Sequence, residues 1–252
     1  MNKVRSIWND GGQVLAGWLQ MPGALHAEAL ARCGYDAVVV DLQHSTIDFE
    51  TALAMLTAIE LGGAEPIVRL KWNEPSDTMK LLDGGAYGVI APMIDTGAQA
   101  RSFAGSLHYP PRGQRSFGPR RPALRYGAGY AAIASDTLIA LAMIETRQAL
   151  ANLDAILSVD GLDGVFIGPT DLSLSLGFAP KPDSSEPDVV ATIAEVRRRA
   201  HAAGKRVGIF CAGGDFARAK LAEGFDLVTL TPDLTMITET AKTVLAKARA
   251  MG

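Results

Sequence analysis

The sequence of 252 residues contains little cysteine, little histidine and no long hydrophobic run. Its two cysteines, Cys33 and Cys211, stand outside any CxxC motif or Cys/His cluster, which argues against a zinc site and against a disulfide framework. No uncharged apolar stretch approaches the roughly 18 residues that span a membrane, and the N-terminus lacks the apolar core of a signal peptide. We therefore expect reduced cysteines, no membrane partner and a cytoplasmic location.

Neither sign of charge dominates the chain. Its 24 Lys and Arg residues face 27 Asp and Glu residues, for a net charge of −3. A strong positive excess attracts nucleic acids and anionic membranes, and its absence leaves no electrostatic reason to expect either partner. The hydrophobic fraction of 48% and the length predict one compact domain over residues 1–252.

Short apolar segments alternate along the chain with longer amphipathic ones. The short segments are apolar on both faces, as buried parallel strands are, and lie at 14–19, 37–42, 66–70, 88–94, 138–145, 164–168, 206–211 and 227–230. Helices are predicted between them, for example at 24–34, 48–63, 148–159, 188–204 and 234–250. Eight strand–helix units favour an α/β fold of the (β/α)8 TIM barrel type over an open sheet.

The loops that follow the strands build the active site of such a barrel, so their residues are the candidates. These residues are Trp18, Asp41 to His44, Arg69, Pro92, Glu145, Gly168 to Asp171, Phe210 and Thr231 to Asp233. One histidine, one arginine and two separated carboxylates thus fall at the same rim. No local motif brings them together, whereas closure of the barrel does.

The two carboxylates predict a metal site. Glu145 ends the fifth predicted strand and Asp171 follows the sixth, and adjacent parallel strands lie about 4.8 Å apart. Two carboxylates with water are a hard oxygen set suited to Mg2+ or Mn2+, with open positions that a 2-keto acid can chelate. The alternatives are a solvated Glu145, its pairing with Arg147, and an Asp171 that only caps a helix.

Two further rim residues predict proton transfer and anion stabilisation. His44 suits a general base, and the alternative is a solvated loop histidine. Arg69 lies within an apolar strand, where a charge is costly unless it is paired, so it either forms an ion pair with a barrel carboxylate or stabilises a developing enolate oxygen. Lys71 is the only lysine near enough for a Schiff-base route.

One long connection breaks the strand–helix rhythm. Residues 108–130 hold four prolines and the arginines at 112, 115, 120, 121 and 125, and connections of this length are usually functional or disordered. Asp83, just before the fourth strand, has the simple interpretation of an exposed carboxylate at the end of a helix.

Six segments together resemble a known family. They are VVVDLQHSTIDFE (38–50), EPIVRL (65–70), KLLDGGAYGVIAPMI (80–94), PRGQRSFGP (111–119), AMIETRQALANLDAI (142–156) and DGVFIGPTDLSLSLG (163–177). In this order and spacing they closely resemble the class II pyruvate aldolases of the 4-hydroxy-2-oxoheptanedioate aldolase family, and the match to its hydroxyketoacid aldolase members is close. The resemblance implies a barrel of the phosphoenolpyruvate/pyruvate-binding type. It also implies a homo-hexamer of two trimers whose last helix is exchanged between subunits.

The resemblance assigns roles to single residues. Glu145 and Asp171 would bind Mg2+, Mn2+ or Co2+. His44 would be the catalytic base, Asp83 would raise its basicity, and Arg69 would stabilise the enolate. The keto acid's carboxylate would meet the backbone amides of Thr170 and Asp171, because Pro169 has no N–H. Gly168 is a further candidate for substrate binding. From their places at the barrel top alone, Trp18 and Phe210 either line the substrate cavity or belong to ordinary packing.

Two departures and several alternatives accompany the resemblance. The family often has Gln where this chain has Met143, which removes one substrate hydrogen bond, and Glu where it has Gln43. The arginines of residues 112–125 would shape the aldehyde end of the cavity or form a solvated or intersubunit loop. Competing hypotheses are a malyl- or citryl-thioester lyase, which needs a coenzyme A site, and a non-catalytic barrel that binds keto acids. A phosphotransferase is disfavoured because the sequence shows no phosphate-binding glycine loop.

Overall fold

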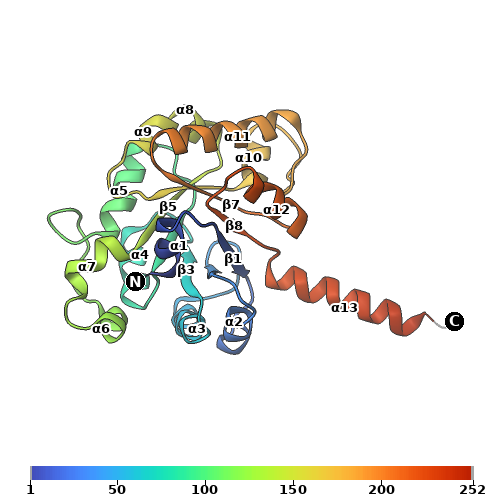
Figure 1. Cartoon of the computed structure of the whole chain (residues 1–252), viewed down its shortest axis with the longest axis horizontal. Coiled ribbons are helices and arrows are strands. Elements are labelled where there is room, and N and C mark those ends of the chain that lie inside the picture. The colour runs from blue at the N-terminus through green and yellow to red at the C-terminus, as the bar shows by residue number, and fades with distance from the viewer. Residues whose placement is uncertain (1, 251–252) are drawn as a thin grey trace.

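A closed barrel of parallel strands forms the centre of the computed structural model, which describes residues 2–250 (Figure 1). The eight strands of this part of the chain are β1 (Val14–Leu19), β2 (Ala37–Asp41), β3 (Glu65–Arg69), β4 (Gly88–Ala91), β5 (Ile139–Ile144), β6 (Gly164–Ile167), β7 (Arg206–Ile209) and β8 (Leu227–Thr229). They follow one another around the barrel, and β1 pairs with β8 to close it. All eight predicted strands and the (β/α)8 fold are confirmed.

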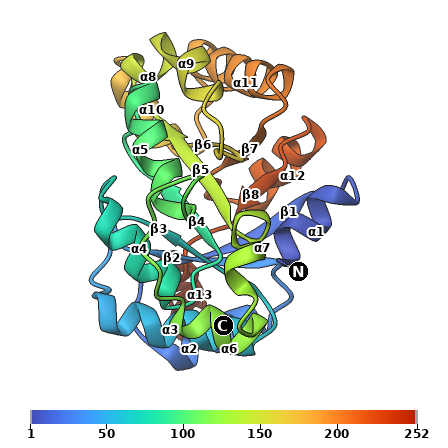
Figure 2. The same ribbon diagram turned by 90° about the vertical axis from the view of Figure 1, so that its left-hand side faces the viewer.

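Helices surround the barrel (Figure 2). They are α1 (Lys3–Asn9), α2 (Ala24–Ala31), α3 (Phe49–Leu61), α4 (Pro75–Asp83), α5 (Gly97–Leu107), α6 (Arg120–Tyr126), α7 (Tyr130–Thr137), α8 (Arg147–Ala151), α9 (Leu153–Leu157), α10 (Pro169–Ser175), α11 (Pro187–Ala202), α12 (Gly214–Ala222) and α13 (Asp233–Arg249). Among residues 2–250, none of these helices has the length and apolar character needed to cross a membrane.

Side chains of the residue just before a helix set several helix starts. The side chains of Asp48, Thr96 and Thr146 each accept a hydrogen bond from the backbone amide three residues on, which satisfies a donor that the helix leaves unpaired. The single helix predicted over 148–159 is wrong, because α8 ends before Asn152 and α9 begins after it. The Asn152 side-chain amide instead donates to the carbonyl of Asp95.

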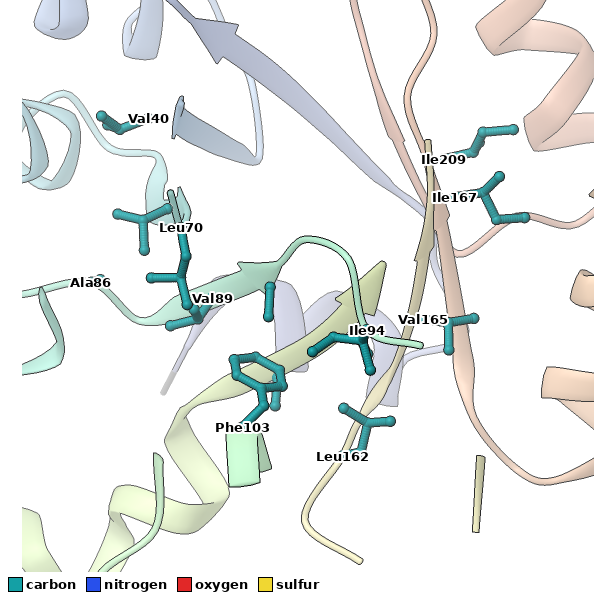
Figure 3. Close-up of a cluster of buried hydrophobic side chains, with 14 of the residues drawn as sticks. Val40, Leu70, Ala86, Val89, Ile94, Phe103, Leu162, Val165, Ile167 and Ile209 are labelled. Carbon is teal, nitrogen blue, oxygen red and sulfur yellow. The ribbon is translucent and has the colours of Figure 1, made fainter. Parts of the chain in front are cut away.

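Two apolar layers follow from the alternation of side chains along each strand. The inward-pointing residues fill the barrel, and they include Trp18, Val39, Ile67, Leu141, Met143, Phe166 and Leu227. The outward-pointing residues pack against the helices, as Figure 3 shows for Val40, Val89, Val165, Ile167 and Ile209. The interior is therefore a packed core, which leaves room for a cavity only at an end of the barrel.

Helix α1 closes one of the two ends. It lies across the amino-terminal end of the barrel, where Val4 and Trp8 join the interior layer and the Trp8 indole N–H donates to the carbonyl of Asp226 at 2.9 Å. The side chain of Asn2 donates to the carbonyl of Tyr87 just before β4. The carboxyl ends of the strands remain as the open end.

The closest strand contact gives a test of the barrel that is independent of function. A Cβ atom placed on Gly164 in β6 would lie 2.1 Å from the backbone oxygen of Arg206 in β7. Since backbone atoms of a paired strand cannot move aside, Gly164→Ala should lower the free energy of unfolding by at least about 2 kcal/mol in urea titrations. Gly129→Ala, where nothing lies within 4 Å of the added atom, is the control and should change stability little. Equal stabilities of the two variants would contradict the strand pairing.

Candidate active site

A cavity of about 320 Å³ opens at the carboxyl ends of the strands. Its walls come from six of the eight strands or the loops after them, and its lining residues are Trp18, Gln20, His44, Arg69, Met143, Phe166, Gly168, Pro169, Thr170, Asp171 and Phe210. All the substrate-binding residues expected from the sequence lie here. Gln20 was not among the expected residues.

Glu145 lies buried beside this cavity, at the end of β5. It is 2% exposed, and its Oε1 accepts a hydrogen bond of 2.8 Å from the backbone amide of Met93. Its Oε2 comes so close to Gly168 that a Cβ there would lie 2.5 Å away. Glycine is thus the residue that lets the carboxylate of β5 reach the loop after β6. The backbone of Met93 is left-handed, with a φ of 55°, a conformation that residues other than glycine rarely adopt.

The electrostatics of this carboxylate fit a cation. Burial, helped by the charge of Asp171, raises the pKa of Glu145 from its ordinary 4.5 to about 7, although the Met93 amide and the charge of Arg69 act to lower it. A buried carboxylate and an exposed one that repel each other are a donor set that a divalent ion would neutralise. Residues 2–250 hold no group of three or more His, Cys, Asp or Glu around one point, so water or substrate would have to complete the ion's coordination.

None of the three alternatives for the two carboxylates is realised, and Glu145 is buried rather than solvated. Arg147 does not pair with Glu145, because its guanidinium donates to the carbonyls of Ser175 and Leu176. Asp171 does not cap α10: the residue before this helix is Gly168, and Asp171 stands in the first turn. Thr170 stands in the same turn, where backbone amides have no acceptor within the helix.

Arg69 is held by the carboxylate of Asp41, a rim residue for which the sequence predicted no role. Its Nε and Nη2 donate to the two oxygens of Asp41 at 2.9 and 2.6 Å, and its guanidinium carbon lies 4.8 Å from the centre of the Trp18 ring. Burial acts to raise the pKa of Asp41, but hydrogen bonding to Arg69 and its charge outweigh burial and lower it. The ion-pair interpretation of Arg69 is therefore realised, and the residue still lines the cavity.

His44 and the aromatic residues take the places expected of them. His44 is exposed at the rim, on the turn that follows β2. Trp18 stacks on Phe166 with ring centres 6.0 Å apart and meets Phe210 edge-on at 5.2 Å. Together with Met143 these rings form the apolar part of the cavity lining.

Asp83 lies at the other end of the barrel. It ends α4, five residues before β4 begins, and its Oδ1 accepts a hydrogen bond of 2.7 Å from Arg115. Burial raises the pKa of Asp83, although Arg115 acts to lower it. Within one chain Asp83 is therefore not a neighbour of His44, and its influence on His44 stays a prediction.

The arginine-rich connection also lies away from this chain's own cavity. It leads into β5 at the amino-terminal end, contains α6, and pairs its arginines with carboxylates: Arg121 with Glu60 and Arg125 with Glu65, each at 2.8 Å. The expectation that these arginines shape the aldehyde end is not met within one chain. Lys71 lies outside the cavity as well, with its amine 2.9 Å from Asp77.

Comparison with known proteins identifies the family. The family model described as HpcH/HpaI aldolase/citrate lyase matches residues 16–239, and the chain belongs to this family. The chain is 68% identical over 251 residues to a hydroxypyruvate/pyruvate aldolase of Rhizorhabdus wittichii, with 100% of both chains covered. It is 37% identical over 249 residues to a 4-hydroxy-2-oxo-heptane-1,7-dioate aldolase of Salmonella typhimurium, covering 98% of this chain and 94% of that one.

Solved structures agree with this assignment. An HpcH/HpaI aldolase/citrate lyase family protein from Burkholderia cenocepacia superposes with a TM-score of 0.91 at 28% identity, covering 99% of this chain and 100% of that one. The citrate synthase SbnG superposes with a TM-score of 0.87 at 28% identity, covering 97% and 96%. The chain is thus an enzyme, a carbon–carbon lyase of the aldolase type.

The raised pKa of Glu145 predicts how the metal-free protein responds to pH. Between its ordinary 4.5 and about 7 the native state binds more protons than the unfolded state, so the free energy of unfolding falls as pH rises through this window. In a chelator, Glu145→Gln should therefore exceed the wild type in stability above pH ~7, by up to roughly 3 kcal/mol, and show no gain below pH ~4.5. Urea unfolding at both ends of the window measures this.

The matched control is Glu195→Gln, which removes an exposed carboxylate of α11 that pairs with Arg198. This variant should give no gain at either pH, because an exposed pair contributes little to stability. A Glu145→Gln variant that is less stable than the wild type at high pH would show that burial of the charged carboxylate does not lower the stability of the native state.

Proposed function

We propose that the chain is a metal-dependent class II aldolase, which adds the enolate of pyruvate or hydroxypyruvate to an aldehyde to give a 4-hydroxy-2-keto acid and catalyses the reverse cleavage. The observation that carries the proposal is the convergence of Glu145 and Asp171 from neighbouring strands beside a cavity that also holds His44 and Arg69. The names of the relatives in Rhizorhabdus wittichii and Salmonella support the choice of substrates.

Side chains of the protein have separate roles in the proposed reaction. Glu145 and Asp171 would hold Mg2+, Mn2+ or Co2+, and such an ion, when bound, polarises the ketone and acidifies the protons on C3. The side chain of Arg69 donates toward the oxygen that becomes negative. A ring nitrogen of His44 accepts a C3 proton and later returns one to the oxygen of the aldehyde. The apolar side formed by Trp18 and Phe210 excludes water from the carbanion.

The competing thioester-lyase hypothesis has little support at this site. A coenzyme A substrate needs cationic groups for its phosphates. Arg69 is the only Lys or Arg that lines the cavity in residues 2–250, and two of its nitrogens are taken by Asp41. A comparison of a thioester with the free keto acid as substrate separates the two reactions.

Exchange of the C3 protons of pyruvate with solvent deuterium tests the proposal, because it needs the enolate but no aldehyde. Purified enzyme should exchange them with Mg2+, Mn2+ or Co2+ and lose this activity in a chelator. The double variant Glu145→Gln, Asp171→Asn should lose at least ~100-fold when followed by NMR. Glu195→Gln should match the wild type.

Two outcomes would overturn the proposal. One is exchange that persists in a chelator with both carboxylates removed. The other is a keto-acid adduct trapped by borohydride, which would indicate a lysine Schiff base. A panel of aldehydes offered with pyruvate and with hydroxypyruvate then identifies the preferred donor.

We further propose that the chain assembles as a homo-hexamer of two trimers in which α13 docks on a neighbouring subunit. In support, α13 projects away from the barrel (Figure 1) and leaves Met236, Ile237, Val244 and Leu245 along one apolar groove. An Asp83 that influences His44 would also have to come from another subunit, since its own chain places it at the opposite end of the barrel.

A charge on the α13 face should weaken this assembly. Ile237 and Val244 are 50% and 60% exposed, and the double variant Ile237→Glu, Val244→Glu should move the light-scattering mass toward a smaller species, because a buried charge without a partner is costly. Lys242→Glu, on the same helix, is the control and should leave the mass unchanged. An unchanged mass for the double variant would place the subunit interface elsewhere.

A further inference from the structure

Asp41 accepts hydrogen bonds from several residues of the active-site rim, and the proposed reaction has so far given it no role. It ends β2, is 0% exposed, and does not line the cavity. Its Oδ1 accepts from Arg69 Nε at 2.9 Å and from the backbone amides of Gln43 and His44 at 3.0 and 3.3 Å. Its Oδ2 accepts from Arg69 Nη2 at 2.6 Å and from the Trp18 indole at 3.3 Å. One carboxylate thus joins three neighbouring strands.

The geometry of these bonds leaves the guanidinium of Arg69 one orientation. Two parallel N–H donors meet the two oxygens of Asp41, a bidentate contact that fixes the plane of the group. The Trp18 ring covers one face of that plane. The remaining nitrogen, Nη1, donates to no protein atom within residues 2–250, while the side chain as a whole lines the cavity. Nη1 is therefore free to donate a hydrogen bond to a substrate oxygen.

We infer that Asp41 is a positioning residue of the active site: it holds Arg69 with its free edge toward the substrate and holds the turn that carries His44. The inference rests on the aldolase function proposed above. A stability role alone would not need charge, because buried ion pairs add little over apolar side chains of similar volume. Asp41 instead gives Arg69 a fixed place, which a group that stabilises a developing charge requires.

The test compares single and double variants of the pair. Arg69→Gln should lower kcat about 100- to 1,000-fold, as loss of one stabilising donor does. Asp41→Asn keeps the size of the side chain but turns an amide N–H toward the donors of Arg69 and Trp18, and it should lower kcat at least ~10-fold. If Asp41 acts through Arg69, the double variant is no slower than Arg69→Gln alone within about threefold.

A structural role would give another result. The losses would then multiply in the double variant, and thermal stability would fall in parallel with activity. The control is Asp226→Asn at the amino-terminal end of the barrel, where Asp226 also accepts an arginine hydrogen bond of 2.8 Å, from Arg206. This variant should keep its kcat whatever stability it loses, whereas Asp41→Asn should lose kcat out of proportion to any loss of stability.

A second variant covers the case in which Asp41→Asn does not fold. Asp41→Glu keeps the charge but moves the carboxylate by one methylene, so it should fold, lower kcat at least ~10-fold and again add nothing to Arg69→Gln. Wild-type kcat in Asp41→Glu or Asp41→Asn, beside an inactive Arg69→Gln, would overturn the role of Asp41 and leave the aldolase proposal standing. Full activity of Arg69→Gln would overturn the roles of both Arg69 and Asp41, whereas a wild-type enzyme without aldolase activity would overturn the proposed function.

Discussion

The hydrogen bonds between β1 and β8 are the constraint on which the site depends. Val14, Leu15 and Ala16 pair with Leu227 to Thr229, and this pairing turns a linear succession of strands into a ring. In an open sheet the loop after β1 and the loop after β7 would lie at distant edges. Closure instead places Trp18 and Phe210 in contact across the same cavity. Glu145 and Asp171 follow the neighbouring strands β5 and β6, and His44 and Arg69 belong to the neighbouring β2 and β3; closure of the ring brings these two pairs around one cavity.

The strands could be predicted because burial on both faces leaves a plain signal in the sequence. Once the order of strands and helices is known, the rim residues follow from the direction of the chain, which is how Glu145, Asp171, His44 and Arg69 were found. Helix boundaries are less visible, because a single side chain decides them. Asn152, which turns its amide to Asp95, divides a helix that the hydrophobic pattern alone would continue.

The direction of the chain also explains why the positions of Asp83 and of the arginines before β5 were predicted less well. Helices run back from the rim, so Asp83 at the end of α4 and the arginines before β5 reach the amino-terminal end of the barrel. Asp41 was predicted to lie at the rim but received no role, for a different reason. As the last residue of an apolar strand it resembles an ordinary strand end, and the number of donors it serves depends on β1 and β3, which lie beside it only in space.

Helix α1 covers the amino-terminal end of the barrel. With Trp8 packed among the interior side chains, the amino-terminal end of the barrel is filled, and the cavity opens at the carboxyl end. A packed helix far from the proposed reacting atoms thus decides from which end of the barrel a substrate enters.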